Sequence, residues 1–502
     1  MLLNQYFSFN SPVWFNVGTP SPQQVSACFI LSVDDSMDSI LNWYKEEGFI
    51  FKGGSGAGLN LSRIRSSKEL LSSGGTASGP VSFMRGADAS AGTIKSGGAT
   101  RRAAKMVVLD VDHPDIEEFI ETKAREEDKI RALRDAGFDM DLGGKDIVSV
   151  QYQNANNSVR VTDEFMRAVE EGTSFGLTSR KDGSVIEEVD ARDLMRKVSE
   201  AAWECADPGI QYDDTINDWH TNPETGRITA SNPCSEYMSL DNSSCNLASL
   251  NLLKFLTDDD TFDAERFEQA VELIITAMDI SICFADFPTE AIGQTTRDYR
   301  QLGIGYANLG ALLMAMGKGY DTDAGRSTAA AITSIMTGAS YRRSAELAAV
   351  VGPYNGYAVN ADAHQRVVDA PHGAEEADEG RRAAHRGEDR QARLQAAGGV
   401  VDGLAQGAGE PVVEAQHAVQ LVPVVGVVAD RLGAAFGQVA EGVVGGGGEG
   451  RHAGVEAGGV PELLGAAAHA AQLHEAPGLH EGHRPGGIAT GCQATRCGQP
   501  AG

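Results

Sequence analysis

The stretch KMVVLDVDHPDIEEFIETKAREED (105–128) contains the pattern that decides the fold. Its first seven residues (105–111) form an apolar, β-rich run that predicts a strand. From Asp115 onward, acidic side chains in a first turn open a helical pattern. A strand that leads directly into a helix is the repeating unit of α/β proteins.

The same alternation continues on both sides of this stretch. Strands are expected at VSACFILSV (25–33) and DIVSVQY (146–152), and a helix at TDEFMRAVEEG (162–172), which Thr162 begins. A further helix is expected at 263–284, where spacings typical of one helical face relate Phe267, Val271, Ile274, Ile275 and Met278. The pattern predicts an α/β fold with a mainly parallel sheet and sites at the carboxyl ends of its strands.

Composition excludes several classes of protein. The chain has 502 residues and a net charge of -28, with 70 acidic against 42 basic side chains. This balance argues against nucleic acid or an anionic membrane as a broad partner. Because no apolar run is long enough to span a bilayer and the N-terminus has no basic region followed by an apolar stretch, we expect a soluble cytoplasmic protein. Seven cysteines are too few for a disulfide scaffold.

The composition changes sharply near residue 365. The last Trp is Trp219, the last Lys is Lys318 and the last Met is Met336, whereas nine of the eleven His lie at or beyond His364. We therefore expect an organised part over 1–365 and a low-complexity tail over 366–502. The tail is either a flexible segment or the product of codons read out of frame, and we favour the frameshift. We interpret its many His as compositional and expect no metal site.

Three glycine-rich loops lie at 51–65, 72–80 and 91–105. Glycine lets backbone N–H groups approach a ligand, and neighbouring Arg side chains supply positive charge. None of the loops matches a known phosphate-binding motif, and each alone is an ordinary turn. Together they favour a phosphate-bearing ligand.

The segment SNPCSEYMSLDNSSCNLASLNL (231–252) is the strongest indication of chemistry. In an extended strand, Asn232, Cys234 and Glu236 would share one face. An amide, a thiol and a carboxylate in one pocket can bind, react and move a proton. The alternative is a buried cysteine in a turn after Pro233. Cys245 follows eleven residues later.

This segment resembles the active-site strand of the catalytic subunit of ribonucleotide reductases. The resemblance runs in order over residues 9–357 and is carried by several further segments. These are FNSPVWFNVG (9–18), SACFILSVDDSMDSI (26–40), GSGAGLNLSRIRS (54–66), GGATRRAAKMVVLDVDHPDIEEFIETK (97–123), NANNSVRVTDEFM (154–166) and RQLGIGYANLGALL (300–313). The sequences of these segments resemble the adenosylcobalamin-dependent branch, class II, more than the class I branch. The large subunit of class I needs a separate radical-generating subunit.

The resemblance implies the chemistry of five residues. Cys234 would carry a thiyl radical, Glu236 would accept the 3′-hydroxyl proton of the ribose, and Asn232 would hold both groups in register. Cys28 and Cys245 would be the reducing pair, which ends each turnover as a disulfide. Thioredoxin or glutaredoxin would then reduce this disulfide.

The resemblance also implies two binding sites for nucleotides. Ser11, Ala27, Gly54, Ser55 and Gly56 would line the site of the ribonucleotide substrate. The effector, a deoxynucleoside triphosphate, would bind within the region of about 26–105. The residues assigned to it are Asp35, Arg65, Lys95 and Ser96. A homodimer is possible.

The family fold is a ten-stranded α/β barrel, of which this chain resembles the first half and the start of the second. No later Ser/Thr loop for the substrate phosphates is found. We therefore also consider an inactive fragment that only binds deoxynucleotides. An incomplete barrel exposes strand edges, which predicts poor solubility or a molten state.

The other cysteines have plain interpretations. Cys205 and Cys283 lie on expected apolar helical faces, where packing is the favoured role. Cys492 and Cys497 lie in the tail, and we assign them no electron-relay role.

Overall fold

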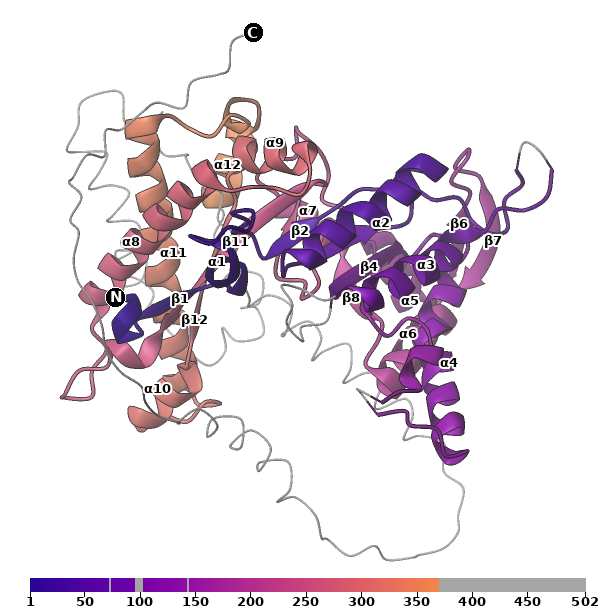
Figure 1. Cartoon of the computed structure of the whole chain (residues 1–502), viewed down its shortest axis with the longest axis horizontal. Coiled ribbons are helices and arrows are strands. Elements are labelled where there is room, and N and C mark those ends of the chain that lie inside the picture. The colour runs from indigo at the N-terminus through magenta and orange to yellow at the C-terminus, as the bar shows by residue number, and fades with distance from the viewer. Residues whose placement is uncertain (72–73, 95–102, 142–143, 370–502) are drawn as a thin grey trace, which may run out of the picture. The chain divides into compact units, whose positions relative to one another are not determined.

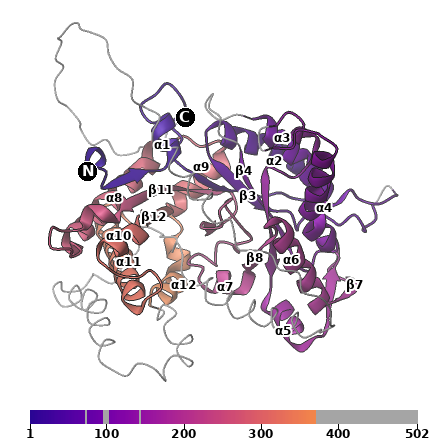
Figure 2. The same ribbon diagram turned by 90° about the horizontal axis from the view of Figure 1, so that it is seen from below.

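The computed structural model describes residues 1–71, 74–94, 103–141 and 144–369. This part of the chain forms an α/β fold around one eight-stranded sheet, which Figures 1 and 2 show from two directions. Its strands are β1 (Phe7–Phe9), β2 (Cys28–Ile30), β3 (Gly56–Asn60), β4 (Ala104–Asp110), β5 (Ala155–Val161), β8 (Gly209–Tyr212), β11 (Ser243–Asn251) and β12 (Leu302–Ala307).

Five neighbouring strands are parallel, in the order β2-β3-β4-β5-β8. Each strand pairs with the next parallel strand along the chain, and helices make the connections. The helices are α2 (Met37–Lys52), α3 (Gly79–Thr93), α4 (Ile116–Asp135), α5 (Asp163–Glu171) and α6 (Ala191–Cys205), and a hairpin of β6 (Ser174–Thr178) and β7 (Val185–Asp190) separates the last two. The α/β fold with a mainly parallel sheet is confirmed.

The predicted helices begin where their capping residues indicate. The side chain of Thr162 accepts a hydrogen bond from the Phe165 backbone N–H at the start of α5. Asp263 does the same for α8 (Ala264–Phe284), and the five apolar side chains expected on one face of this helix are buried. Local capping and apolar spacing therefore fixed these helices.

The parallel strands have two buried faces. On the outer face, Phe29 and Val107 pack with Trp43 of α2 and with other helical side chains. On the inner face lies a smaller cluster that includes one hairpin of the chain, formed by β9 (Ala230–Ser231) and β10 (Met238–Ser239). Its members are Cys28, Ile30, Met106, Val108, Ala230, Tyr237 and Cys245. Because both faces are covered, β4 is apolar over residues 106–109, and the charged residues Lys105 and Asp110 flank this run.

The long strand β11 joins this half to a second core. It is antiparallel to β1 and β2 and parallel to β12. Helix α8 packs on it and on β12, and α11 (Asp323–Val351) packs on α8, through apolar side chains of one core. The remaining helices are α1 (Ser11–Asn16), α7 (Asp213–Asp218), α9 (Glu290–Tyr299), α10 (Leu309–Ala315) and α12 (Tyr357–Asp369). Across the described residues, the outermost strands β8 and β12 do not pair, so the sheet is an open, incomplete barrel.

The prediction of a strand at 146–152 is wrong. Residues Ile147–Ser149 form a short 3-10 helix, and Val148 is 85% exposed. Val150 packs instead in a small satellite cluster with Ile130 and Met140. The strand of this region is β5, whose Asn, Ser and Arg side chains concealed it from an analysis based on apolar runs.

The end of the organised part lies close to the composition change. Helix α12 continues past residue 365 to Asp369, and the tail residues 370–502 lie outside the described part. Tyr354 and His364, joined by a hydrogen bond of 3.0 Å, hold this helix next to Asn222. Among the helices described, none combines the length and the apolar character needed to cross a membrane.

Candidate active site

The hairpin of residues 230–239, called the cysteine hairpin below, lies against the inner face of the sheet. Two glycines of β3 make this close approach possible. A Cβ atom at Gly58 would lie 1.9 Å from the backbone oxygen of Ser231, and one at Gly56 would lie 2.7 Å from Pro233 Cγ. Part of the glycine-rich loop at 51–65 is thus a strand that supports the hairpin.

Polar contacts from neighbouring strands hold the cysteine hairpin. Asn156 of β5 donates to the backbone oxygen of Pro233 at 2.9 Å, and Gln211 of β8 donates to Ser231 Oγ at 2.8 Å. At the start of the hairpin, Asn60 of β3 donates to the backbone oxygen of Thr229 at 2.9 Å. The sheet therefore fixes the hairpin along its length.

The tip of the hairpin is a turn and not an extended strand. The backbone N–H of Ser235 donates to the Asn232 oxygen, and Ser235 has a left-handed φ of 63°. The expected alternation of Asn232, Cys234 and Glu236 on one face of a strand is therefore wrong. The turn directs the two side chains differently, so that Asn232 is buried whereas Cys234 is exposed.

Asn232 and Glu236 both contact Cys28. The Asn232 amide donates to Cys28 Sγ at 3.0 Å, and the Cys28 thiol donates to Glu236 Oε1 at 3.4 Å. Cys28 lies directly opposite Cys245 in the antiparallel pair of β2 and β11. Residues separated by more than 200 positions thus form one cluster of thiols, amide and carboxylate.

The cluster is buried, and this has electrostatic consequences. Cys28 is 4% exposed and Cys245 is 1% exposed. The hydrogen bond with Cys245, then burial, then the carboxylate of Glu236 raise the pKa of Cys28 well above its usual value. Cys28 therefore keeps its proton at neutral pH. Within the described residues, Glu236 Oε2 is buried and has no hydrogen-bond partner.

The cluster lies at the amino ends of the parallel strands. Cys28 is the first residue of β2, and it pairs with Gly56, the first residue of β3. The general expectation of a site at the carboxyl ends does not hold for this cluster, because the cysteine hairpin crosses the inner face and places its tip at the opposite end.

The residues expected to line a substrate site lie around this end of the sheet. Ala27 and Gly56 share a backbone hydrogen bond of 3.0 Å beside Cys28. The hydroxyl of Ser55 is buried and donates to the Ser26 oxygen. Gly54 has a φ of 88°, which favours glycine, and Ser11 begins α1. The predicted set is thus divided between the strand ends and the neighbouring helix α1.

Two of the four residues expected to bind an effector are in contact. Arg65 Nε donates to the carboxylate of Asp35, and the Arg65 backbone N–H lies 3.3 Å from Asp35 Oδ1. This pair joins the loops that follow β2 and β3. Lys95 and Ser96 lie outside the described residues.

The other cysteines differ from one another. Cys205 is half-buried, packs against the outer core and donates to the Ala201 oxygen, so its predicted packing role is confirmed. Cys283 is exposed on α8, and its predicted packing role is wrong. The buried face of α8 includes Met278 and Ile282. Cys283, which follows Ile282, lies on a different face of the helix. Cys492 and Cys497 lie outside the described part.

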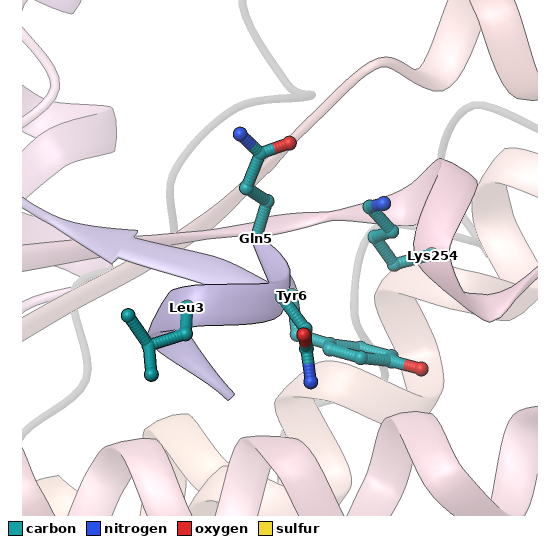
Figure 3. Close-up of a pocket in the computed structure, with 5 residues that line it drawn as sticks. Leu3, Gln5, Tyr6 and Lys254 are labelled. Carbon is teal, nitrogen blue, oxygen red and sulfur yellow. The ribbon is translucent and has the colours of Figure 1, made fainter.

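Two hollows lie away from the cysteines. One, of about 400 Å³, is formed by residues 3–6 and Lys254 near the N-terminus (Figure 3). The other, of about 410 Å³, lies at the carboxyl ends of β3 and β4. Its lining residues are Leu31, Asn60, Ser62, Arg63, Asp110, Arg180, Thr229 and Asp241. Neither hollow is lined by Cys28, Cys234 or Cys245.

Sequence analysis missed several residues that support the cluster. Tyr237 is 1% exposed, and its hydroxyl donates to Ser243 Oγ at 2.8 Å, which ties the cysteine hairpin to β11. Asn156 and Gln211 contact the hairpin from the sheet. The polar sequence NANNSVRV (154–161) could have indicated these contacts, because polar side chains on a buried central strand need hydrogen-bond partners.

Comparison with known proteins gives consistent matches. The family model of the ribonucleotide reductase barrel domain matches residues 26–398. A vitamin B12-dependent ribonucleotide reductase of Streptomyces avermitilis is 81% identical over 371 residues, which cover 73% of this chain and 38% of the relative. One of Rhodopirellula baltica is 48% identical over 396 residues, covering 73% of this chain and 38% of the relative.

A more distant relative agrees. A vitamin B12-dependent ribonucleoside-diphosphate reductase of Mycobacterium tuberculosis is 35% identical over 324 residues, covering 64% of this chain and 43% of that protein. The chain thus spans about 38% of the length of the curated relatives that it matches most strongly. Because the barrel-domain model covers more than half of the chain, the chain belongs to the ribonucleotide reductase family.

Proposed function

We propose that this chain carries the first half of the catalytic barrel of a vitamin B12-dependent ribonucleotide reductase, which converts ribonucleotides to 2′-deoxyribonucleotides for DNA synthesis. One observation carries the proposal: the cysteine hairpin brings Asn232 and Glu236 to Cys28, opposite Cys245. The relatives named above have this activity in their names. These names favour the cobalamin branch over a large subunit with a separate radical-generating subunit.

The first step uses Cys234. In the radical state, its sulfur removes the hydrogen atom from C3′ of the ribose, which forms an S–H bond and leaves the unpaired electron on C3′. The exposure of Cys234 at the tip of the turn supports this role, because a substrate can reach it. At the end of the cycle, Cys234 returns the hydrogen atom to C3′.

Glu236 and Asn232 act on the 3′-hydroxyl group. The carboxylate of Glu236 takes the hydroxyl proton, and the amide of Asn232 keeps the reacting groups in register. The buried Glu236 Oε2, which lacks a partner among the described residues, supports this role, because a substrate hydroxyl would satisfy it.

Cys28 and Cys245 supply the reduction. One thiol gives its proton to the departing 2′-hydroxyl group, which leaves as water, and the two thiols together provide two electrons. The products are a deoxyribonucleotide, water and a disulfide between the two cysteines. The raised pKa of Cys28 supports a role as proton donor, since the thiol stays protonated at neutral pH.

The remaining assignments rest on family membership. Ser11, Ala27 and residues 54–56 would line the substrate site, and Asp35, Arg65, Lys95 and Ser96 would bind a deoxynucleoside triphosphate. Thioredoxin or glutaredoxin would reduce the disulfide in the cytoplasm, and a homodimer would be the assembled form. The contact between Asp35 and Arg65 supports a shared role of their two loops.

We propose adenosylcobalamin as the cofactor, because the relatives are named as vitamin B12-dependent. Neither of the two hollows described above is the place where the cofactor would meet Cys234. Cys234 is exposed and accessible, but neither hollow adjoins it, and each has a volume of only about 400 Å³. The steps above are therefore derived for the residues of this chain only.

The test is an assay of the full chain with adenosylcobalamin, a ribonucleotide and dithiothreitol. Deoxyribonucleotide is expected, and Cys234→Ser should abolish its formation. A Cys283→Ser variant is the matched control, because it removes an exposed thiol outside the cluster. Product formation that persists in Cys234→Ser would overturn the radical assignment.

A second candidate is a chain that binds a deoxynucleotide without performing chemistry. The open sheet among the described residues favours it. In this case dATP or dTTP raises the melting temperature of a chain that forms no product. A melting temperature unchanged at saturating nucleotide would count against the effector site in either candidate.

A further inference from the structure

The two strands of the cysteine hairpin meet near one charged side chain of the neighbouring loops. Thr229 precedes β9 and Asp241 follows β10, and Thr229 Oγ1 donates to Asp241 Oδ1 at 2.8 Å. The other oxygen of Asp241 accepts from Arg63 Nη2, also at 2.8 Å. Arg63 therefore holds the base of the hairpin at the point where both strands leave it.

This ion pair joins a largely buried carboxylate to a half-exposed guanidinium group, since the Arg63 side chain is 51% exposed. The Asp241 side chain is 19% exposed, and burial raises the pKa of its carboxyl group, while Arg63 lowers it. Removal of the cation would leave a largely buried carboxylate that still accepts a hydrogen bond from Thr229 but has lost its ion pair with Arg63.

Arg63 also belongs to the loops that surround the predicted effector residues. Its other guanidinium nitrogen lies 3.6 Å from Asp34, next to Asp35, and Arg63 itself lies two positions before Arg65. Arg63 thus links the loops after β2 and β3 to the base of the hairpin, next to the contact of Asn60 with the Thr229 oxygen.

We propose that Arg63, through its ion pair with Asp241, is a positioning residue that keeps the tip of the cysteine hairpin seated on Cys28. The proposal rests on the proposed function for its catalytic meaning, since the hairpin carries Cys234. Its structural content is independent: the base at Asp241 and the tip at Asn232 are joined by two short strands, so a freed base lets the tip move away from Cys28.

The buried thiol of Cys28 reports this seating. It is 4% exposed and contacts Asn232 and Glu236 of the hairpin, so alkylation of Cys28 requires local opening. Cys205 and Cys283 lie outside the hairpin and serve as internal references in the same molecules. Iodoacetamide labelling with peptide mass spectrometry measures all three rates without cofactor or substrate.

Arg63→Gln and Asp241→Asn should each speed the labelling of Cys28 about three- to tenfold relative to the two reference cysteines. Arg63→Lys, which keeps the charge, should restore part of the protection. The matched control is Lys68→Gln, which breaks a neighbouring ion pair with Glu187 that does not touch the hairpin. It should leave the Cys28 rate unchanged.

The double variant decides whether the two residues act through one contact. Arg63→Gln with Asp241→Asn should label Cys28 no faster than the faster single variant. Multiplying effects, or Cys28 rates within twofold of the parent chain in both single variants, would overturn the proposal. Because the assay needs no turnover, a chain without reductase activity would contradict the proposed function and still decide the role of Arg63.

Discussion

The outer and inner faces of the parallel sheet are both buried, but by different kinds of contact. The outer face packs against helices through apolar side chains such as Phe29, Val107 and Trp43. The inner face packs against the cysteine hairpin, which polar side chains such as Asn156 and Gln211 hold in place. Apolar packing is tolerant of direction, whereas hydrogen bonds fix distances and angles.

This difference separates stability from function. The outer face supplies most of the apolar burial, and it would stabilise many different inner surfaces equally well. The inner face gives up apolar area to place a thiol, an amide and a carboxylate around Cys28. Substitutions on the two faces should therefore have separable effects on unfolding and on the cysteine cluster.

The largest effect on stability is expected on the outer face. Trp43 is fully buried in α2, and Trp43→Ala should lower the free energy of unfolding by about 3–5 kcal/mol, because it leaves a large cavity. Urea unfolding measures this loss. Trp203 of α6 is 91% exposed, so Trp203→Ala should change it by less than about 0.5 kcal/mol. Equal losses in the two variants would contradict the packing described for the outer face.

A smaller effect is expected where β3 meets the cysteine hairpin. A methyl group at Gly58 would lie 1.9 Å from the Ser231 oxygen, so Gly58→Ala should displace the hairpin and cost about 1–3 kcal/mol. Alkylation of Cys28 should become faster at the same time. Gly305 of β12 has no atom within 4 Å of an added Cβ, and Gly305→Ala is the matched control. Unchanged Cys28 protection in Gly58→Ala would show that the hairpin does not need this close approach.

The smallest effect is a pH dependence of the loop that leads into the hairpin. Burial lowers the pKa of His220 from 6.5 to about 4, and its Nδ1 accepts from the Asn222 backbone N–H. The unfolded chain therefore binds the proton first, and stability that is complete above pH 6.5 is lost as the pH falls toward 4. Between pH 7 and 5.5 the loss is about 1 kcal/mol.

His220→Gln should flatten this part of the stability profile, measured by urea unfolding across the pH range. His113, whose pKa burial also lowers, leaves a residual slope. If the parent chain and the His220→Gln variant had identical profiles of unfolding free energy against pH, His220 would not be the source of the pH dependence.

Much of the outer face could be predicted from sequence. Apolar runs and helical spacing identified β2, β4, α4 and α5, and helical spacing also identified α8 of the second core, because burial imposes a readable pattern on the sequence. The strand predicted at 146–152 failed for the same reason: its apolar side chains cover a small satellite cluster. The polar strand β5 was missed, since its side chains pair with a segment about 80 residues later in the chain.

The candidate site was predictable in part. The residue types in NPCSE and the resemblance named Cys234, Glu236, Asn232, Cys28 and Cys245, and four of these form one cluster. The geometry could not be derived from local rules, because the segment is a turn and contacts Cys28 across the sheet. The roles of Tyr237, Arg63 and Asp241 depend on long-range packing, which spacing along the chain does not encode.

The central claim is that the inner face makes Cys28 and Cys245 a redox pair. Mild oxidation of the folded chain, followed by cleavage before Asp241 to separate Cys234 from Cys245, and mass spectrometry tests it most directly. The account predicts a Cys28–Cys245 disulfide that forms in the folded chain and is lost in favour of mixed products in urea. A disulfide that links Cys234 to either partner as the main folded-state product, or no intramolecular disulfide, would contradict it.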